Sequence, residues 1–358
     1  MRPLFGRIQG STPIVPVTAL PSSGGVRTFD AFTTCDSLFH QSDPMIRIPF
    51  RRAAAAAFVL AVAAAPLRAQ PAAGGLAVQI APHAYVVSDH GRNLVLITGA
   101  RASMVAGLQE PALVEKARRA LDALHAQPVR YAVLMLGTGA VEWEDAGWEG
   151  RGALAVAHEG LRYRIFRARR SMPDADSAAL RRRSTRVPSM GFSEVVQIAM
   201  DQDEDAHLVK QPDGATDADV AVHFERAGVL YLSSLTTDGY PDIDVEDGGT
   251  LSGLIKTVDA FATNFAGAPQ AIEPIVPARG PLATLQDLRD FRDMLTAVRD
   301  AIKPMMDAGK DPDQVVAAHP TAQFDARWGH GPVSAERFVR MAYAALGKEA
   351  TAAAAPAP

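Results

Sequence analysis

Residues 272–307 read IEPIVPARGPLATLQDLRDFRDMLTAVRDAIKPMMD. The segment Ile272–Val276 is rich in β-branched residues, which predicts a strand. From Leu285 to Asp307 apolar residues recur every three or four positions, and this period predicts a long amphipathic helix. The apolar positions of this helix are Leu288, Phe291, Leu295, Val298 and Ile302. A strand followed closely by such a helix points to a structure in which helices cover a sheet.

The chain before this stretch adds strands and helices in alternation. Two strand-like runs flank His90–Arg92, which predicts a hairpin. Helical spacing predicts helices at Leu113–Leu124 and Leu251–Phe265, and a last helix that begins after Ser334. Further strands are expected at Tyr131–Leu136, Leu154–Ala157, Val195–Met200, Ala206–Lys210, Val220–Phe224 and Val229–Leu232. The mixture predicts one layered α/β domain over residues 70–350, because no boundary for a second domain is visible.

The composition suits a globular protein with a sizeable core, since 48% of the 358 residues are hydrophobic and 21% are charged. The formal net charge is -4 and neither half of the chain is strongly basic, so we expect no nucleic-acid partner. The one locally basic stretch, Arg162–Arg186, also holds acidic and small residues and is interpreted as a solvated face. Cys35 is the only cysteine, which excludes a disulfide framework and a thiolate metal site.

The segment 45–69 reads MIRIPFRRAAAAAFVLAVAAAPLRA. Arginines, then a short alanine-rich apolar run, then a small residue form the layout of a secretory signal peptide. The run is short for a membrane span, and an uncleaved membrane anchor is the alternative. We therefore expect a periplasmic or secreted protein whose only membrane contact is through this segment.

The two ends of the chain carry no predicted fold. Residues 1–44 are rich in Pro, Gly, Ser and Thr without sustained periodicity, and we expect translation to start at Met45. The exported chain would then contain no cysteine, in keeping with an oxidising compartment. Residues 351–358 are low in complexity, which predicts a disordered tail.

Several separated motifs follow one another in a characteristic order. They are Pro128-Val129-Arg130-Tyr131, Ala157-His158-Glu159, Asp242-Ile243-Asp244, Gly248-Gly249, Pro277-Ala278-Arg279-Gly280-Pro281 and Phe324-Asp325-Ala326-Arg327-Trp328-Gly329. In this order and spacing, residues 78–347 resemble the periplasmic branch of the metallo-β-lactamase superfamily. The resemblance implies an α/β fold of four layers, an αββα metallo-β-lactamase-like sandwich, with a metal site at one edge of its two sheets.

Members of that family hold one or two Zn²⁺ ions with His and Asp, and the metal makes a bound water nucleophilic. The resemblance aligns those ligands with residues that cannot replace them. The signature His-x-His-x-Asp-His falls on Leu136, Thr138, Ala140 and Val141, the next His on Ala215, the bridging Asp on Ser234 and the final His on Arg279. A structural acid of the early strands falls on Ala106. We expect a degenerate site without metal, and therefore no zinc cofactor.

Arg279 is the most informative of these replacements, and two interpretations of it remain open. As a structural cation it would pair with acids that the resemblance places nearby, namely Asp217, Asp219, Glu142 and Glu144. As part of an anion-binding site with Asp217 and Glu144, it would receive a carboxylate or phosphate through two hydrogen bonds.

Three other residues in this frame have simpler interpretations. His158 is expected to be a hydrogen-bonded structural histidine rather than a catalyst. Trp143 and Trp148 lie in the loop that covers the active site in the family, where they either fill the vacated volume or line a hydrophobic groove. We assign no catalytic residue.

The loss of every ligand favours a pseudoenzyme, that is, a non-catalytic exported protein with a binding or accessory role toward a small molecule or a protein. The alternative is a hydrolase of this fold that is metal-independent or has an atypical metal site. The fold does not decide between the two, since one scaffold carries many activities.

Overall fold

The computed structural model describes residues 69–108, 110–135, 147–171, 188–201, 204–264 and 274–354, which all belong to the compact unit Ala63–Pro358. The predicted extension (1–44) and nearly all of the predicted signal peptide (45–69) lie outside the described residues. Within the described residues, every helix is too short or too polar to cross a membrane.

The strands of the first sheet lie side by side in chain order. They are β1 (Gln70–Ala72), β2 (Ala77–Ala81), β3 (Ala84–Asp89), β4 (Arg92–Thr98), β5 (Ser103–Leu108), β6 (Val129–Met135), β7 (Leu154–His158) and β8 (Met190–Phe192). The strands from β1 to β5 pair antiparallel, whereas those from β5 to β8 pair parallel. Parallel neighbours need crossover connections. Accordingly α1 (Pro111–Ala123) connects β5 with β6, and α2 (Glu159–Ser171) lies between β7 and β8.

The second sheet continues from the first at one rung, where Arg279 of β13 lies opposite Arg92 of β4. Its strands are β9 (Val195–Asp201), β10 (Glu204–Lys210), β11 (Val220–Phe224), β12 (Val229–Thr236) and β13 (Ile275–Arg279), again in chain order. They pair antiparallel except for β12 with β13, which are parallel and are connected through α4 (Leu251–Asn264). The sequence-predicted strands of this half are all present.

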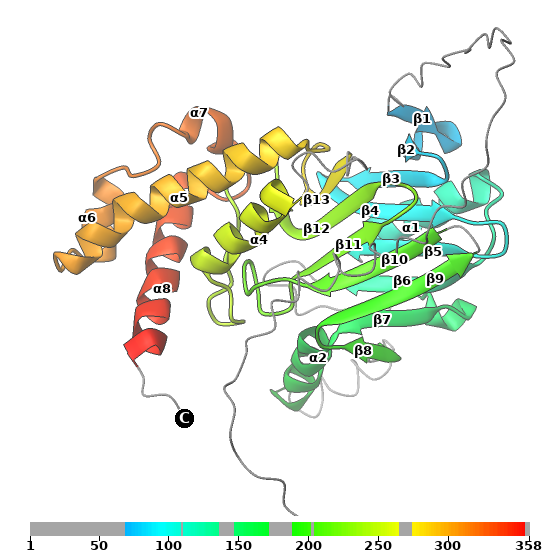
Figure 1. Cartoon of the computed structure of the whole chain (residues 1–358), viewed down its shortest axis with the longest axis horizontal. Helices are drawn as coiled ribbons and strands as arrows, with labels where there is room; N and C mark the ends of the chain where they lie inside the picture. The colour runs from blue at the N-terminus through cyan, green and yellow to red at the C-terminus, as the bar shows by residue number, and fades with distance from the viewer. Residues whose placement is uncertain are drawn as a thin grey trace, which may run out of the picture. The chain divides into compact units, whose positions relative to one another are not determined.

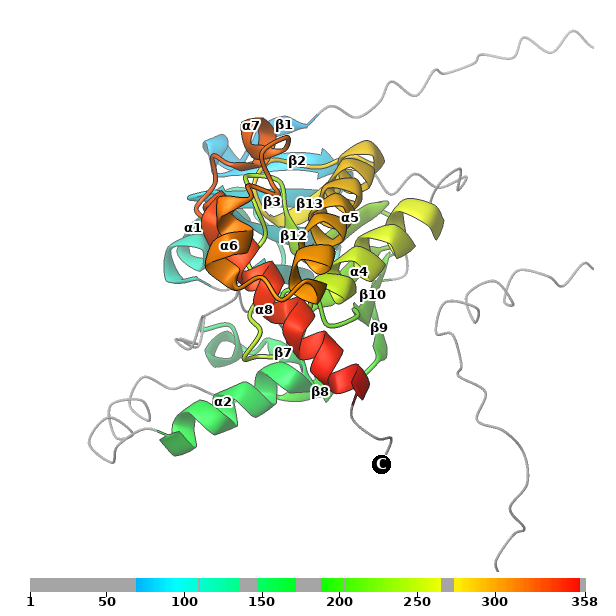
Figure 2. The same cartoon turned by 90° about the vertical axis from the view of Figure 1, so that its left-hand side faces the viewer.

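Helices cover the outer face of each sheet. α1 packs on β3 and β4, and α2 packs on β7 and β8. On the other side α4, α5 (Leu285–Asp307) and α8 (Ala335–Ala354) contact one another, and their buried residues form one cluster with residues of β12. Figures 1 and 2 show these helices, with α6 (Pro312–Ala317) and α7 (Asp325–Trp328), gathered on one side of the strands. The order of layers is helix, sheet, sheet, helix, which confirms the predicted αββα architecture.

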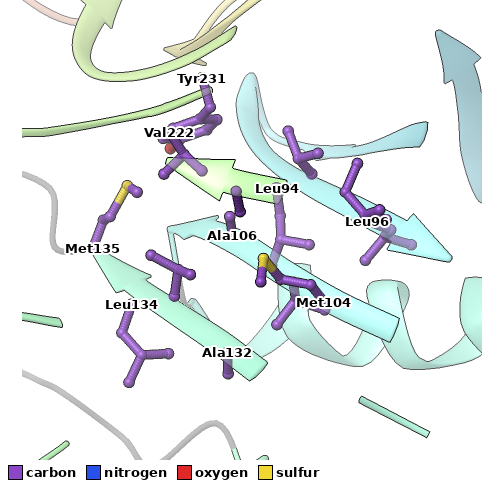
Figure 3. Packing of buried hydrophobic residues seen from close by; sticks show 14 of the residues in the cluster. Leu94, Leu96, Met104, Ala106, Ala132, Leu134, Met135, Val222 and Tyr231 are labelled. Carbon is purple, nitrogen blue, oxygen red and sulfur yellow. The ribbon is translucent and has the colours of Figure 1, made fainter. Parts of the chain in front are cut away.

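The two sheets pack face to face through apolar side chains. Val222 of β11 and Tyr231 of β12 come from the second sheet and share one core with Leu94, Met104 and Leu134 of the first (Figure 3). Each of these five side chains is at most 3% exposed. Burial of one such side chain stabilises the fold by about 1.5–3 kcal/mol, so the apolar side chains between the two sheets contribute a large share of the stability.

The long helix α5 forms as its apolar spacing predicts. Thr284 caps its N-terminus in a capping box: the side chain of Thr284 accepts from the Asp287 N–H, and the Thr284 N–H donates to Asp287 Oδ2 at 2.9 Å. The five predicted apolar positions, Leu288, Phe291, Leu295, Val298 and Ile302, are at most 2% exposed. The strand before it, β13, begins at Ile275, whereas the prediction began at Ile272, outside the described residues.

The last helix is longer than the sequence analysis expected. α8 runs from Ala335 to Ala354, so Thr351–Ala354, which were assigned to a disordered tail, continue the helix. Alanine has the highest helix propensity of all residues, and an alanine-rich run therefore extends a helix that is already formed. Low complexity is a weak signal of disorder when the repeated residue is alanine.

Candidate functional site

The joint between β4 and β13 fixes the position of Arg279. Asn93 of β4 is 2% exposed, and its Nδ2 donates to the carbonyl oxygens of Pro277 at 2.9 Å and Gly280 at 2.8 Å. Ser88 Oγ donates to Asn93 Oδ1 at 2.6 Å. Because these bonds hold a carbonyl group on each side of Arg279, the end of β13 is tied to β4.

Arg279 forms an ion pair with Asp238, which lies two residues after the end of β12. Arg279 Nη2 is 3.2 Å from Asp238 Oδ2, and Thr236 Oγ1 donates to Asp238 Oδ1 at 2.6 Å. The Arg279 side chain is 30% exposed, so part of the guanidinium faces solvent. Its Nε is buried and has no hydrogen-bond partner among the described residues. A buried N–H without an acceptor costs about 1–3 kcal/mol.

A second guanidinium, that of Arg92, lies beside Arg279. Burial lowers the pKa of Arg92, the charge of Arg279 lowers it further, and Asp238 acts in the opposite direction. Arg92 also forms an ion pair with Glu110. We call Arg92, Glu110, Asp238 and Arg279 the arginine cluster. It joins residues from both sheets at the point where the sheets meet.

Ala215 lies in a loop that a buried acid organises. Asp219 is 4% exposed and accepts hydrogen bonds from the Ala215 N–H at 2.6 Å and from Thr216 Oγ1 at 2.9 Å. Burial raises the pKa of Asp219 to about 6, although its hydrogen bonds from Thr216 and Ala215 oppose the shift. Ala215 itself is 8% exposed, so a buried methyl group stands at the position that the sequence resemblance aligns with a histidine of the family.

Asp217 has a cation of its own, on helix α2. Arg164 forms ion pairs with Asp217 and, at 3.4 Å, with Asp247. Arg167, one turn later, pairs with Asp247 as well. Within the described ranges, Arg279 and Asp217 form no ion pair with each other.

The acid that pairs with Arg279 therefore differs from the sequence-based expectation of Asp217 or Asp219. The parallel pairing of β12 with β13 sets Thr236 opposite Arg279, so Asp238, two residues farther on, is the acid within reach. Arg279 and Asp217 thus each pair with a different partner, Asp238 and Arg164.

The remaining predicted positions comprise two described residues and a group that follows β6 in the sequence. Ser234 of β12 is 8% exposed, and Ala106 of β5 is fully buried. The others, Leu136, Thr138, Ala140, Val141, Glu142, Trp143 and Glu144, lie outside the described residues. Of the residues that the sequence resemblance aligns with ligands of the family, the structure describes Ala215, Ser234 and Arg279.

These three positions do not fit a zinc ion. Ala215 offers a methyl group, Ser234 a neutral hydroxyl, and Arg279 a positive charge that is already paired with an acid. Zinc in proteins is bound by thiolate, imidazole and carboxylate groups. A guanidinium at a ligand position also repels a divalent cation.

His158 is a structural residue, as predicted. It is 7% exposed, its Nδ1 accepts from the Gly160 N–H at 3.1 Å, and its Nε2 lies 3.0 Å from the Ser193 carbonyl oxygen. An acceptor role at Nδ1 and a carbonyl partner at Nε2 fit the neutral tautomer protonated at Nε2. Burial lowers the pKa of His158, which favours the same neutral form.

The described residues at the end of β6 enclose little open volume. A cavity of about 10 Å³, lined in part by Met135, His158 and Arg164, has room for about one water molecule. Trp148 is 4% exposed, and the Arg118 guanidinium lies 5.1 Å from the centre of its ring. Of the two interpretations of Trp148, core filling is the one that its burial supports.

Sequence reasoning missed three residues of the joint, Arg92, Asn93 and Asp238. Arg92 was noted as part of a hairpin turn and Asn93 as part of a strand. A local signal existed for Asp238, since an Asp-Gly pair directly follows the strand that carries Ser234. No local signal marks Arg92 or Asn93, because their partners come from the far end of the chain.

No protein-family model matches the chain, and the search of curated proteins finds no match. Among solved structures, a double mutant of the sec-alkyl sulfatase PisA1 has a TM-score of 0.54 and 14% identity, covering 79% of this chain and 52% of that one. The stereoselective inverting sec-alkylsulfatase Pisa1 from Pseudomonas sp. gives 0.51 and 13%, with the same coverage. A metallo-β-lactamase from Pontibacter korlensis gives 0.42 and 13%, covering 62% of this chain and 98% of that one. The last score is too low to support an argument.

This chain spans about half the length of the two sulfatase structures that it matches. At such identities the similarity concerns the fold alone. The described part of the chain has the metallo-β-lactamase-like αββα fold that the sequence resemblance implied.

Proposed function

We propose that this chain is a non-catalytic, exported protein of metallo-β-lactamase-like fold that binds a small organic or inorganic anion at the arginine cluster. The observation that carries the proposal is the partly exposed side chain of Arg279, 30% exposed, with a second guanidinium, that of Arg92, beside it. Export rests on the signal-like segment 45–69.

The chemistry of the cluster favours an oxyanion. Asp238 accepts one hydrogen bond from the Arg279 guanidinium, through Nη2, and the Arg279 side chain remains 30% exposed. A carboxylate, sulfate or phosphate oxygen is the acceptor that a guanidinium binds best, through charge-assisted hydrogen bonds. Arg92 adds a second positive charge. Burial and the charge of Arg279 both disfavour the charged form of Arg92 and lower its pKa. A bound anion would relieve that repulsion.

A hydrolase is the alternative. The fold similarity to the sec-alkylsulfatases is compatible with a hydrolase. A shared fold does not determine the activity of this chain, however. Against it stand Ala215, Ser234 and Arg279, which supply no zinc ligand set. A zinc hydrolase depends on the metal to generate its nucleophile near neutral pH.

Calorimetric titration of the full chain with sodium acetate and with sodium sulfate, at constant ionic strength, tests the proposal. We expect binding that Arg279→Gln weakens by at least about tenfold, because the charge-assisted hydrogen bonds are lost. The anion affinity of Arg279→Lys should lie between those of the wild type and of Arg279→Gln, since lysine keeps the charge but lacks the planar guanidinium. Preference for acetate or for sulfate distinguishes the two ligand classes.

Arg299→Gln is the matched control, because Arg299 pairs with its neighbour Asp300 on the surface of α5 and is 32% exposed. Equal binding by wild type and by Arg279→Gln would contradict the proposal. So would zinc-dependent turnover of ester or sulfate-ester substrates by the wild-type chain.

A further inference from the structure

A second group of polar residues lies on strands β10 and β11, away from every predicted ligand position. In the register of these strands, His207 lies opposite His223 and Ala206 opposite Phe224. One rung farther on, the Glu225 N–H donates to the Asp205 carbonyl oxygen at 3.0 Å. Side chains alternate along a strand, so Asp205, His207, His223 and Glu225 share one face of the sheet.

The side chains of this face converge. One ligand atom each from Asp205, His207 and Glu225 lies within 4.8 Å of the other two. His207 Nε2 is 3.1 Å from Glu225 Oε2, and the His207 and His223 ring centres are 6.3 Å apart. Imidazole nitrogen and carboxylate oxygen are the ligands that zinc takes when no thiolate is present.

The surroundings hold these side chains in place. On the opposite face of the same strands, Ala206, Leu208, Val222 and Phe224 are 0% exposed, which fixes the register of β10 against β11. Gln197 of β9 donates from Nε2 to Asp205 Oδ2 at 2.9 Å. A hydrogen bond of this kind orients a carboxylate and leaves its other oxygen for a ligand role.

Charge gives a further reason to expect a cation here. Asp205 and Glu225 are like charges at neighbouring positions on adjacent strands, an arrangement that destabilises a sheet. A divalent ion between them would turn this repulsion into attraction.

We propose that Asp205, His207 and Glu225 bind one divalent transition-metal ion of the zinc class, with His223 or water as the fourth ligand. Tetrahedral coordination at metal–ligand distances of about 2.1 Å puts the ligand atoms about 3.4 Å apart. Side-chain rotations that move these atoms by roughly 1 Å are enough to form the site, and the strands need not move. The site does not depend on the arginine cluster and is distinct from the family's metal position. Its effect is to clamp β10 to β11.

Zinc titration of the full chain after chelator treatment, in competition with a chromophoric chelator, tests this site. We expect one equivalent bound with a dissociation constant of about a micromolar or tighter. His207→Ala and Glu225→Gln should each weaken binding at least about tenfold, since three-ligand sites lose most of their affinity with one ligand. Saturating zinc should raise the melting temperature of the wild type and not that of His207→Ala.

His90→Asn is the matched control, because it removes an imidazole that is 91% exposed at a turn, and asparagine tolerates the positive φ of 45° there. Glu225→Gln keeps the shape of the side chain, so a loss of binding in that variant does not reflect misfolding. Zinc binding weaker than about millimolar, or binding equal in wild type and both variants, would overturn the proposal. Neither result bears on anion binding at Arg279.

Discussion

Asn93 supplies two donors and one acceptor at the joint where the two sheets meet. Asn93→Asp keeps the shape but sets a carboxylate oxygen against the carbonyls of Pro277 and Gly280. We expect a loss of about 2–5 kcal/mol in the free energy of unfolding, because two buried carbonyls lose their donor and a charge is buried. Urea denaturation measures the loss.

The matched control for this change is Gln314→Glu. Gln314 Oε1 accepts from the Asp311 N–H at an exposed capping box, and glutamate keeps that acceptor. We expect its free energy of unfolding to stay within about 0.5 kcal/mol of wild type. An Asn93→Asp chain as stable as this control would mean that the joint does not depend on Asn93.

Asp219 gives the stability of the fold a pH dependence. Its pKa is raised by burial from an ordinary value near 3.8 to about 6, so between these values the folded chain binds more protons than the unfolded chain. Stability contributed by this group is therefore present at low pH and falls as the pH rises through about 4 to 6, by up to about 3 kcal/mol. Asp219→Asn, which does not titrate, should show a flatter stability profile over this window. Identical profiles for the two chains would contradict the assignment.

At the scale of single residues the sequence located Arg279 but not its partner. The sequence resemblance aligns Arg279, in the motif of residues 277–281, with a ligand histidine of the family. That Asp238 is the acid within reach depends on the parallel register of β12 and β13, which no local pattern encodes. Likewise His207 and His223 look scattered along the chain and become neighbours only when β10 pairs with β11.

At the scale of elements, the capping box of α5 is the feature most open to test. Thr284→Ala removes the side chain that accepts from the Asp287 N–H. We expect destabilisation of about 0.5–2 kcal/mol, because an orphan N–H at the helix start loses its partner. Thr296→Ala inside the same helix is the control and should be neutral or slightly stabilising, since alanine has the higher helix propensity. Thermal or urea unfolding compares the two, and equal effects would rule out the cap as a source of stability.

Periodic elements were predictable because their signals are local. The five apolar positions of α5 repeat at helical spacing, and all five face the core. The end of α8 was not predictable from composition, since an alanine-rich run fits both a disordered tail and a helix. The structure shows that a preceding amphipathic helix extends through Ala354.

At the scale of the whole molecule, the joint of the two sheets connects the fold with the proposed function. In the family that the sequence resembles, the metal site lies at an edge of the sheets. Here β4 and β13 meet through Arg92 and Arg279, which carry positive charge. The proposal is that anion binding at this joint replaces the metal chemistry that the sequence resemblance would imply.

Elemental analysis of the His207→Ala variant, after dialysis first against zinc and then against zinc-free buffer, tests whether the metal position implied by the sequence resemblance holds zinc in this chain. In this variant the proposed strand site binds zinc at least about tenfold more weakly, so zinc that remains after dialysis into zinc-free buffer would lie elsewhere. We expect a folded protein with less than about 0.1 equivalents of zinc, because the described positions Ala215, Ser234 and Arg279 offer no zinc ligand. One or two equivalents that survive dialysis would contradict the account and identify a functioning metal site.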